Sequence, residues 1–200
     1  MRANKWQIIM LKSIREQYNI PSNAKILLYV GNISVNKNQL QMVEAFGLLP
    51  AALREQTFVL FCGQNHDATN KVEKAIIDSS FASHLVLCGG VDKKDMASYY
   101  QAADAVVLLS KAEGFGLSLI EGLHFGKPCL MFTDMDAFED IFDVNAVVGV
   151  SDRSSQCVAE GIEKLLSNQW DENKIKSHSE KFGSRTMAKN YVGIYKTIVS

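Results

Sequence analysis

The sequence lacks the excess of basic residues that marks most proteins that bind nucleic acids. Its 200 residues include 21 Lys and Arg against 22 Asp and Glu, for a formal net charge of −1. Binding to a phosphate backbone usually requires a concentration of positive charge. We therefore expect no nucleic-acid partner, and any cation that a phosphate ligand needs must be supplied locally.

The sequence contains no pattern that would predict a membrane-spanning segment or a secretory leader. No apolar run approaches the roughly 20 residues that a spanning helix needs, and residues 1–6 lead into a charged segment where a leader would have an apolar core. We expect a cytoplasmic protein with no transmembrane segment. The basic face of the stretch 6–18 leaves peripheral contact with the inner face of a membrane open, although a solvated face on a packed helix is the favoured interpretation.

Clustered metal ligands are missing as well. None of the four cysteines (Cys62, Cys88, Cys129 and Cys157) belongs to a Cys-x-x-Cys pair, and the four histidines are scattered. A zinc site needs clustered soft ligands, and Asp134 and Asp136 alone do not make a convincing carboxylate cage. We therefore expect no metal, and we interpret the cysteines as small core residues in a reducing compartment.

What the sequence does contain is a repeated alternation of apolar runs and amphipathic stretches. Six short runs have the length of strands buried on both faces: 26–30, 58–62, 85–88, 105–109, 128–132 and 146–150. Helical spacing occurs at 39–49, 92–103, 117–125 and 156–166, with flanking stripes at 6–18 and 187–198. Asp92 is the expected N-cap of its helix. The alternation predicts an α/β fold with a doubly wound parallel sheet, in one domain spanning residues 1–200.

Ligands of such sheets bind at the carboxyl ends of the strands, beside helix N-termini that attract phosphate. The loop after the first strand contains Gly31, Ser34 and Lys37. Gly31 permits a tight turn and close approach of a ligand, while the hydroxyl and the ammonium group can contact a phosphate. By themselves these residues also fit a plain loop with a solvated lysine.

The loop after the fourth strand carries a stronger signal. Glu113 stands just beyond the strand, Gly114 and Gly116 remove side chains from the turn, and Glu121 lies further along the helix that follows. Two carboxylates can accept hydrogen bonds from hydroxyl groups, while backbone N–H groups at the helix start attract anionic oxygens. A sugar joined to a diphosphate presents both kinds of group. The alternative is that Glu113 only caps the helix and Glu121 is only exposed.

Glu113-Gly-Phe-Gly116, with Glu121 after seven intervening residues, resembles the Glu-x7-Glu motif of retaining GT-B glycosyltransferases, most closely those of glycosyltransferase family 4. Similarity to that family extends over nearly the whole chain, at 90–91, 103–110, 122–128, 138–141 and 187–195. The resemblance implies a Rossmann-like domain, the C-terminal half of a GT-B architecture, and a hexosyltransferase that uses a UDP- or GDP-linked sugar. It further implies a role in cell-surface polysaccharide synthesis.

The resemblance also implies roles for individual residues. Lys37 would steady the diphosphate beside Gly31, Asn32 and Ser34, and Gly90 and Val91 would line the base. Glu113 would contact the hydroxyl groups of the sugar, and Glu121 those of the ribose. The backbone of Gly114, Phe115, Gly116 and Leu117 would meet the sugar and the diphosphate. Lys37, Glu113 and Glu121 are thus the candidate catalytic residues, with the two glutamates orienting the donor.

Two departures from the family pattern shape these expectations. Asn32 stands where the family commonly has an arginine, which leaves Lys37 as the main cation. The chain matches only the donor-binding half, so we expect that the N-terminal acceptor domain is absent and that the 200 residues alone are inactive. The alternatives are a subunit of a split two-chain glycosyltransferase and a non-catalytic module that binds a nucleotide sugar.

Overall fold

The structure is a computed structural model that describes residues 13–183 and residue 186. Its centre is a six-stranded parallel sheet with the strand order β3-β2-β1-β4-β5-β6. The strands are β1 (Lys25–Val30), β2 (Thr57–Cys62), β3 (Leu85–Gly89), β4 (Ala105–Leu108), β5 (Cys129–Phe132) and β6 (Val147–Val150). All six predicted strands are confirmed, with ends that differ by one residue at most.

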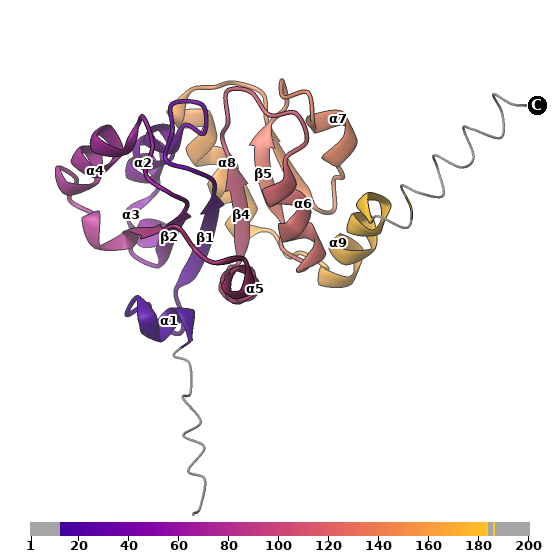
Figure 1. The fold of residues 1–200 in the computed structure, drawn as a ribbon, viewed down its shortest axis with the longest axis horizontal. Coiled ribbons are helices and arrows are strands. Elements are labelled where there is room, and N and C mark those ends of the chain that lie inside the picture. The colour runs from indigo at the N-terminus through magenta and orange to yellow at the C-terminus, as the bar shows by residue number, and fades with distance from the viewer. Residues whose placement is uncertain (1–12, 184–185, 187–200) are drawn as a thin grey trace, which may run out of the picture.

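Helices cover both faces of this sheet (Figure 1). The α-helices are α1 (Ile14–Gln17), α2 (Gln39–Leu48), α3 (Ala51–Arg54), α4 (Thr69–Ile77), α5 (Lys93–Ala102), α6 (Leu117–His124), α7 (Phe138–Ile141), α8 (Ser155–Ser167) and α9 (Glu172–Ser179). Two short 3-10 turns are η1 (Ala82–His84) and η2 (Glu180–Phe182). Helix α2 packs against α4 and α8, whereas α6 packs against α9 and α5 against α1. The doubly wound α/β fold predicted from the sequence is confirmed.

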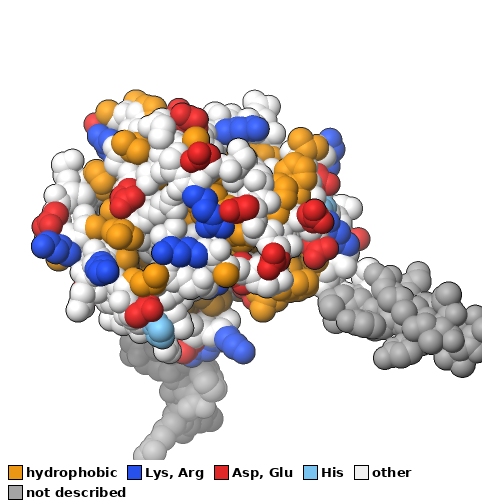
Figure 2. Space-filling model, turned by 90° about the horizontal axis from the view of Figure 1, so that it is seen from above, with side chains coloured by type: hydrophobic (Ala, Val, Ile, Leu, Met, Phe, Trp, Pro, Cys, Tyr) orange, Lys and Arg blue, Asp and Glu red, His pale blue; other side chains and the backbone are white. Residues whose placement is uncertain are grey.

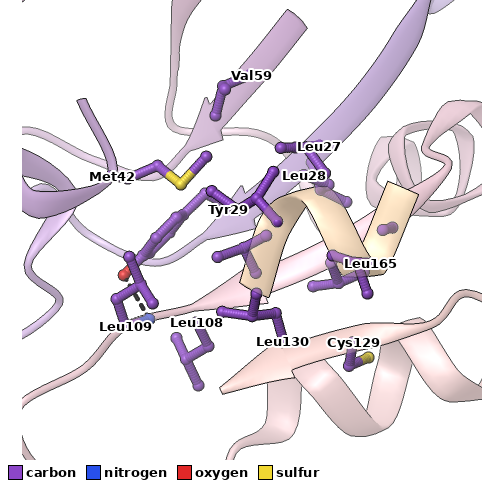
Figure 3. Packing of buried hydrophobic residues seen from close by; sticks show 14 of the residues in the cluster. Leu27, Leu28, Tyr29, Met42, Val59, Leu108, Leu109, Cys129, Leu130 and Leu165 are labelled. Atoms are coloured by element: carbon purple, nitrogen blue, oxygen red, sulfur yellow. Dashed lines mark hydrogen bonds between the residues drawn. The ribbon is translucent and has the colours of Figure 1, made fainter. Parts of the chain in front are cut away.

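The core lies between these layers because the central strands are apolar on both faces. Every residue of β2 and β4 is buried, which is the pattern of parallel strands covered by helices on each side. Figure 3 shows Tyr29 of β1 among buried aliphatic side chains, with its hydroxyl directed at the backbone of Leu109. This tyrosine has no exposed surface and joins the core to the loops above it.

Helices rather than strands account for the differences from the sequence prediction. Helices α3, α4, α7 and α9 were not predicted. Helices α3 and α7 have only four residues each, and the buried positions of α4 and α9 include the polar residues Thr69 and Ser179. Asp92 is the N-cap of α5, as predicted, but its side chain makes no capping hydrogen bond and lies 3.8 Å from the Lys94 ammonium. Of the predicted helix at 6–18, only Ile14–Gln17 is a described helix, and the predicted helix at 187–198 lies outside the described residues.

Candidate functional site

The candidate site lies at the edge of the sheet where the strands end. Strands β1 and β4 are neighbours at the sheet's centre, and from them the chain proceeds to opposite sides. Loops diverge at such a point and leave a crevice, which is the usual ligand site of an open α/β sheet. Figure 2 shows this edge from above, with basic and acidic side chains intermixed and not gathered into areas of one sign.

Two of the predicted catalytic side chains meet at this crevice. The Lys37 ammonium donates to Oε2 of Glu113, and the pair is largely buried, with 24% and 17% of the two side chains exposed. Gly31 makes room for the lysine, because a Cβ there would lie 3.3 Å from the carbons of the Lys37 side chain. The structure therefore joins the loops after β1 and β4 through an ion pair between two predicted site residues.

A set of hydrogen bonds holds these two loops together. The Lys111 N–H donates to the Asn36 carbonyl at 2.8 Å, and the Asn36 side chain makes two further bonds to the backbone of Ala112, both at 3.1 Å. The Tyr29 hydroxyl donates to the Lys37 carbonyl and accepts from the Leu109 N–H at 2.8 Å. Burial raises the pKa of Tyr29 above its ordinary value, so the hydroxyl keeps its proton for this bond.

A second set of contacts fixes the loop after β1 against the end of β2. Gln39 is fully buried, and its amide donates to the carbonyls of Gly31 and Asn32 at 3.2 and 3.0 Å while accepting from the Ser34 N–H. A Cβ on Gly63 would lie 2.0 Å from the Gly31 carbonyl oxygen. The backbones after β1 and β2 can therefore approach each other only because residue 63 is glycine.

A cleft of about 480 Å³ opens between the ends of β1, β2 and β3. Its lining includes four of the predicted ligand-binding residues, Gly31, Asn32, Gly90 and Val91. A second cleft of about 410 Å³ shares the wall at residues 90–92. Asn32 Oδ1 accepts from the Gln64 N–H at 3.2 Å, and Ser34 Oγ accepts from the Lys37 N–H at 3.1 Å, so both side chains also stabilise the loop.

The start of α6 adjoins the Lys37–Glu113 pair. Gly116 precedes the helix with φ of +66°, and Glu113 Oε1 accepts from its N–H at 3.4 Å. Because the N-cap residue is a glycine, it has no side chain that could cap α6. N–H groups of the first turn of α6 therefore face the loop. A Cβ on Gly114 would meet nothing within 4 Å. The Phe115 ring packs edge-on against the Phe182 ring, with 6.3 Å between the ring centroids. Phe115 does not line the 480 Å³ cleft.

Glu121 lies one turn into α6 and does not contact Glu113 or Lys37 in the structure. Its Oε2 accepts a 2.6 Å hydrogen bond from the Tyr100 hydroxyl, and Tyr100 belongs to α5, the helix that follows Gly90 and Val91. Burial and the neighbouring carboxylate raise the pKa of Tyr100. The predicted residues thus form two groups, the residues that line the 480 Å³ cleft and the Lys37–Glu113 pair, and Gly31 belongs to the first and contacts the second. Glu121 is connected to the cleft through Tyr100 of α5.

Arg153, which the sequence did not indicate as a site residue, lies beside the loop after β4. Its guanidinium stacks on the Phe132 ring at 4.3 Å and donates two 2.8 Å hydrogen bonds to Asp134. These bonds hold the pKa of Asp134 below its usual value. Arg153 also donates to the Ser110 carbonyl at 3.3 Å. An isolated arginine in a polar loop gives no sequence signal for these contacts.

Metal ligands do not converge in the described part of the chain. Among residues 13–183 and 186, no group of three or more His, Cys, Asp or Glu side chains has an arrangement that could hold a metal ion. The absence of a metal from the reaction stays a prediction.

The chain is similar in sequence to known glycosyltransferases. The family model described as "Glycosyl transferases group 1" matches residues 11–183. A lipopolysaccharide 1,2-N-acetylglucosaminetransferase of Salmonella typhimurium is 31% identical over 59% of this chain and 32% of its own length. An uncharacterized glycosyltransferase of Methanocaldococcus jannaschii is 24% identical over 96% of this chain and 52% of its own length. The chain thus spans about half or less of these two curated relatives.

Solved structures share the fold. A glycosyltransferase from Rickettsia africae superposes with a TM-score of 0.78 at 23% identity, covering 93% of this chain and 51% of that one. Anabaena HepE, solved in complex with UDP and glucose, superposes with a TM-score of 0.74 at 18% identity, covering 92% of this chain and 50% of that one. In both cases this chain corresponds to about half of the neighbour.

Proposed function

The chain belongs to the glycosyl transferases group 1 family as a domain of the GT-B type, and from this premise we propose that it binds the nucleotide-sugar donor of a retaining glycosyl transfer. The observation that carries the proposal is the Lys37–Glu113 pair at the centre of the sheet edge. On one side of the pair lies the cleft at Gly31, Gly90 and Val91, and on the other the uncapped start of α6.

Each part of a nucleotide sugar has a chemical counterpart along this edge. The base fits the cleft beside Gly90 and Val91, and the diphosphate fits between Lys37 and the first N–H groups of α6, which favour negative charge. On binding, the Lys37 ammonium exchanges Glu113 for phosphate oxygens. Glu113 is then free to accept hydrogen bonds from sugar hydroxyls, and Glu121 to accept them from the ribose.

The proposed reaction breaks the bond between the anomeric carbon of the sugar and the diphosphate oxygen. Negative charge collects on the departing diphosphate, and a cation and helix dipole fixed beside it stabilise that charge as it develops. The acceptor hydroxyl attacks from the face that the diphosphate leaves and passes its proton to the departing diphosphate oxygen, which retains the anomeric configuration. Glu113 and Glu121 orient the donor in this scheme and do not act as nucleophile and acid.

The acceptor is proposed to bind outside this chain. The relatives are about twice as long or more, which supports an assignment of residues 1–200 as the donor-binding half, with an acceptor half in the same or another chain. The name of the Salmonella relative and the UDP and glucose bound to HepE support a hexosyl donor linked to UDP and a cell-surface polysaccharide product, with a GDP-linked donor as the alternative. In the described residues no helix is both long and apolar enough to cross a membrane. Location in the cytoplasm stays a prediction, and contact with the inner face of a membrane stays the alternative to a solvated basic face.

Titration calorimetry with a panel of UDP, GDP and their hexose conjugates tests this proposal. We expect the chain, with its cysteines reduced, to bind one nucleoside diphosphate series with a Kd below millimolar. We also expect it to show no measurable transfer of sugar to a simple acceptor. Folded protein that binds no member of the panel at millimolar ligand contradicts the donor assignment. Turnover by the 200 residues alone contradicts only the need for a separate acceptor half.

A further inference from the structure

Two cysteines lie side by side beneath the wall that separates the two clefts. Cys62 ends β2 and Cys88 lies near the end of β3. The register of these parallel strands shifts after Phe61, which pairs with Leu87, so that Cys62 lies opposite Gly89. Because the shift places one extra residue in β3, Cys88 faces the same side of the sheet as Cys62.

The two thiols are close enough to interact. The side chains of Cys62 and Cys88 lie near enough for each to shift the pKa of the other. A strand spacing of about 4.8 Å and a rise of about 3.3 Å per residue put their Cα atoms about 6 Å apart. That separation lies within the range of roughly 4.4–6.8 Å that disulfides usually span.

The surroundings distinguish the two sulfurs. Cys62 is 2% exposed and borders the 480 Å³ cleft, whereas half-buried Cys88 borders the 410 Å³ cleft. The Cys88 thiol donates to the Val86 carbonyl at 3.8 Å, and the nearby Tyr18 hydroxyl lies 2.8 Å from the Tyr99 hydroxyl. The neighbouring Cys62 and then Tyr18 lower the pKa of Cys88, whereas the neighbouring Cys88 and burial raise the pKa of Cys62.

This asymmetry is the one that a reactive dithiol needs, because a thiolate attacks the oxidant and a second thiol resolves the product. We propose that Cys62 and Cys88 are an oxidisable dithiol that a peroxide closes to a disulfide, and that closure blocks the cleft beside residues 90–92. The second half of this proposal rests on the proposed function.

The chemistry is a two-electron oxidation. The Cys88 thiolate attacks one peroxide oxygen, the O–O bond breaks, and a sulfenic acid forms as water leaves. The Cys62 sulfur then attacks the Cys88 sulfur, the S–O bond breaks, and a second water leaves with the remaining thiol proton. Two thiols and one hydrogen peroxide thus become one disulfide and two waters, and a thiol reductant reverses the change.

Closure would act on the clefts because the next residues form their walls. Gly63 follows Cys62 directly and donates its N–H to the Gly89 carbonyl at 2.9 Å. Gly90 and Val91 follow the Cys88 strand and line both clefts. A covalent bond between the strand ends therefore changes the backbone against which the donor's base is proposed to lie.

Peptide mapping of the full chain tests the disulfide. The reduced protein is treated with hydrogen peroxide, alkylated after denaturation and digested, and we expect one linked pair, Cys62 with Cys88, while Cys129 and Cys157 remain alkylated. Cys88→Ser should abolish the link, Cys62→Ser should trap a sulfenic acid that dimedone labels on Cys88, and the matched control Cys157→Ser should keep the link. If Cys88 is oxidised without any link to Cys62, the proposal is overturned.

Calorimetry with UDP and GDP tests the coupling on the same samples. We expect oxidation to weaken binding at least tenfold and a reductant to restore it, in wild type and in Cys157→Ser but not in Cys88→Ser. Equal affinities of the linked and reduced forms overturn the coupling. If the reduced wild type binds neither nucleotide, the proposed function fails, while the peptide map still decides whether the dithiol exists.

Discussion

Replacing Lys37 with methionine is expected to weaken the binding of a nucleoside diphosphate about 10- to 100-fold. A hydrogen bond to a charged group contributes roughly 1.5–3 kcal/mol, and each 1.4 kcal/mol changes affinity about tenfold. Methionine retains an unbranched stem that can still lie over Gly31, so the loss isolates the ammonium group. Calorimetry with the bare diphosphate and with the sugar conjugate should show the same loss for both ligands.

Glu113→Gln, in contrast, is expected to affect the two ligands differently. Removing the carboxylate frees Lys37 from its ion pair, so the bare diphosphate should bind as well as in wild type or better. The sugar conjugate should lose its additional affinity, because an amide accepts hydrogen bonds from hydroxyls less strongly than a carboxylate.

Lys111→Met is the matched control for these variants. Lys111 is an exposed lysine in the loop after β4, so its replacement should leave both affinities unchanged. Circular dichroism of each variant confirms that the fold is retained. Equal loss of both ligands in Glu113→Gln, or unchanged binding in Lys37→Met, would contradict the assigned roles.

Gly63→Ala is expected to cause the largest loss of stability of any single methyl addition at this edge. The added Cβ would lie 2.0 Å from the Gly31 carbonyl oxygen and 2.8 Å from the Asn32 nitrogen, and both are backbone atoms. Separating the ends of β1 and β2 to admit it should cost about 3 kcal/mol of unfolding free energy. In a chain of this length that corresponds to a fall in Tm of roughly 6–12 °C.

Gly114→Ala at the same edge provides the contrast. A Cβ there meets nothing within 4 Å of the protein, so its Tm should stay within about 2 °C of wild type. The methyl group should nevertheless reduce donor affinity, because the turn it occupies is proposed to face the sugar. Thermal unfolding followed by circular dichroism measures both variants, and a Gly63→Ala protein as stable as Gly114→Ala would contradict the packing described here.

Strands were easier to predict than helices because of how each buries its side chains. A central parallel strand such as β2 is buried on both faces, and its apolar run at 58–62 therefore stands out in the sequence. A helix buries only one stripe, and in α9 that stripe consists of Ile175 and Ser179 among polar residues. The periodicity of such a helix is too weak to separate it from a loop.

Site residues could be predicted where the residue type alone indicates a chemical role. They were missed where the role depends on the group that the side chain hydrogen-bonds. The loop glycines and paired glutamates identified the edge, and the structure brings Lys37 and Glu113 together there. Gly63 follows its strand just as Gly31 does, so the same rule would have found it. Tyr29 and Gln39 gave no such signal, because each looks like an ordinary strand or helix residue until the backbone it hydrogen-bonds is known.

Amide NMR of protein labelled with ¹⁵N at glycine tests most directly whether the donor binds across the centre of the sheet edge. The 13 glycines include several along the proposed site and others far from it, such as Gly47, Gly126 and Gly161. Titration with the nucleotide sugar that binds best should shift the signals of the site glycines (Gly31, Gly63, Gly90, Gly114 and Gly116) and leave those distant ones in place. Shifts confined to the distant glycines, or no shift at millimolar ligand, would contradict the account.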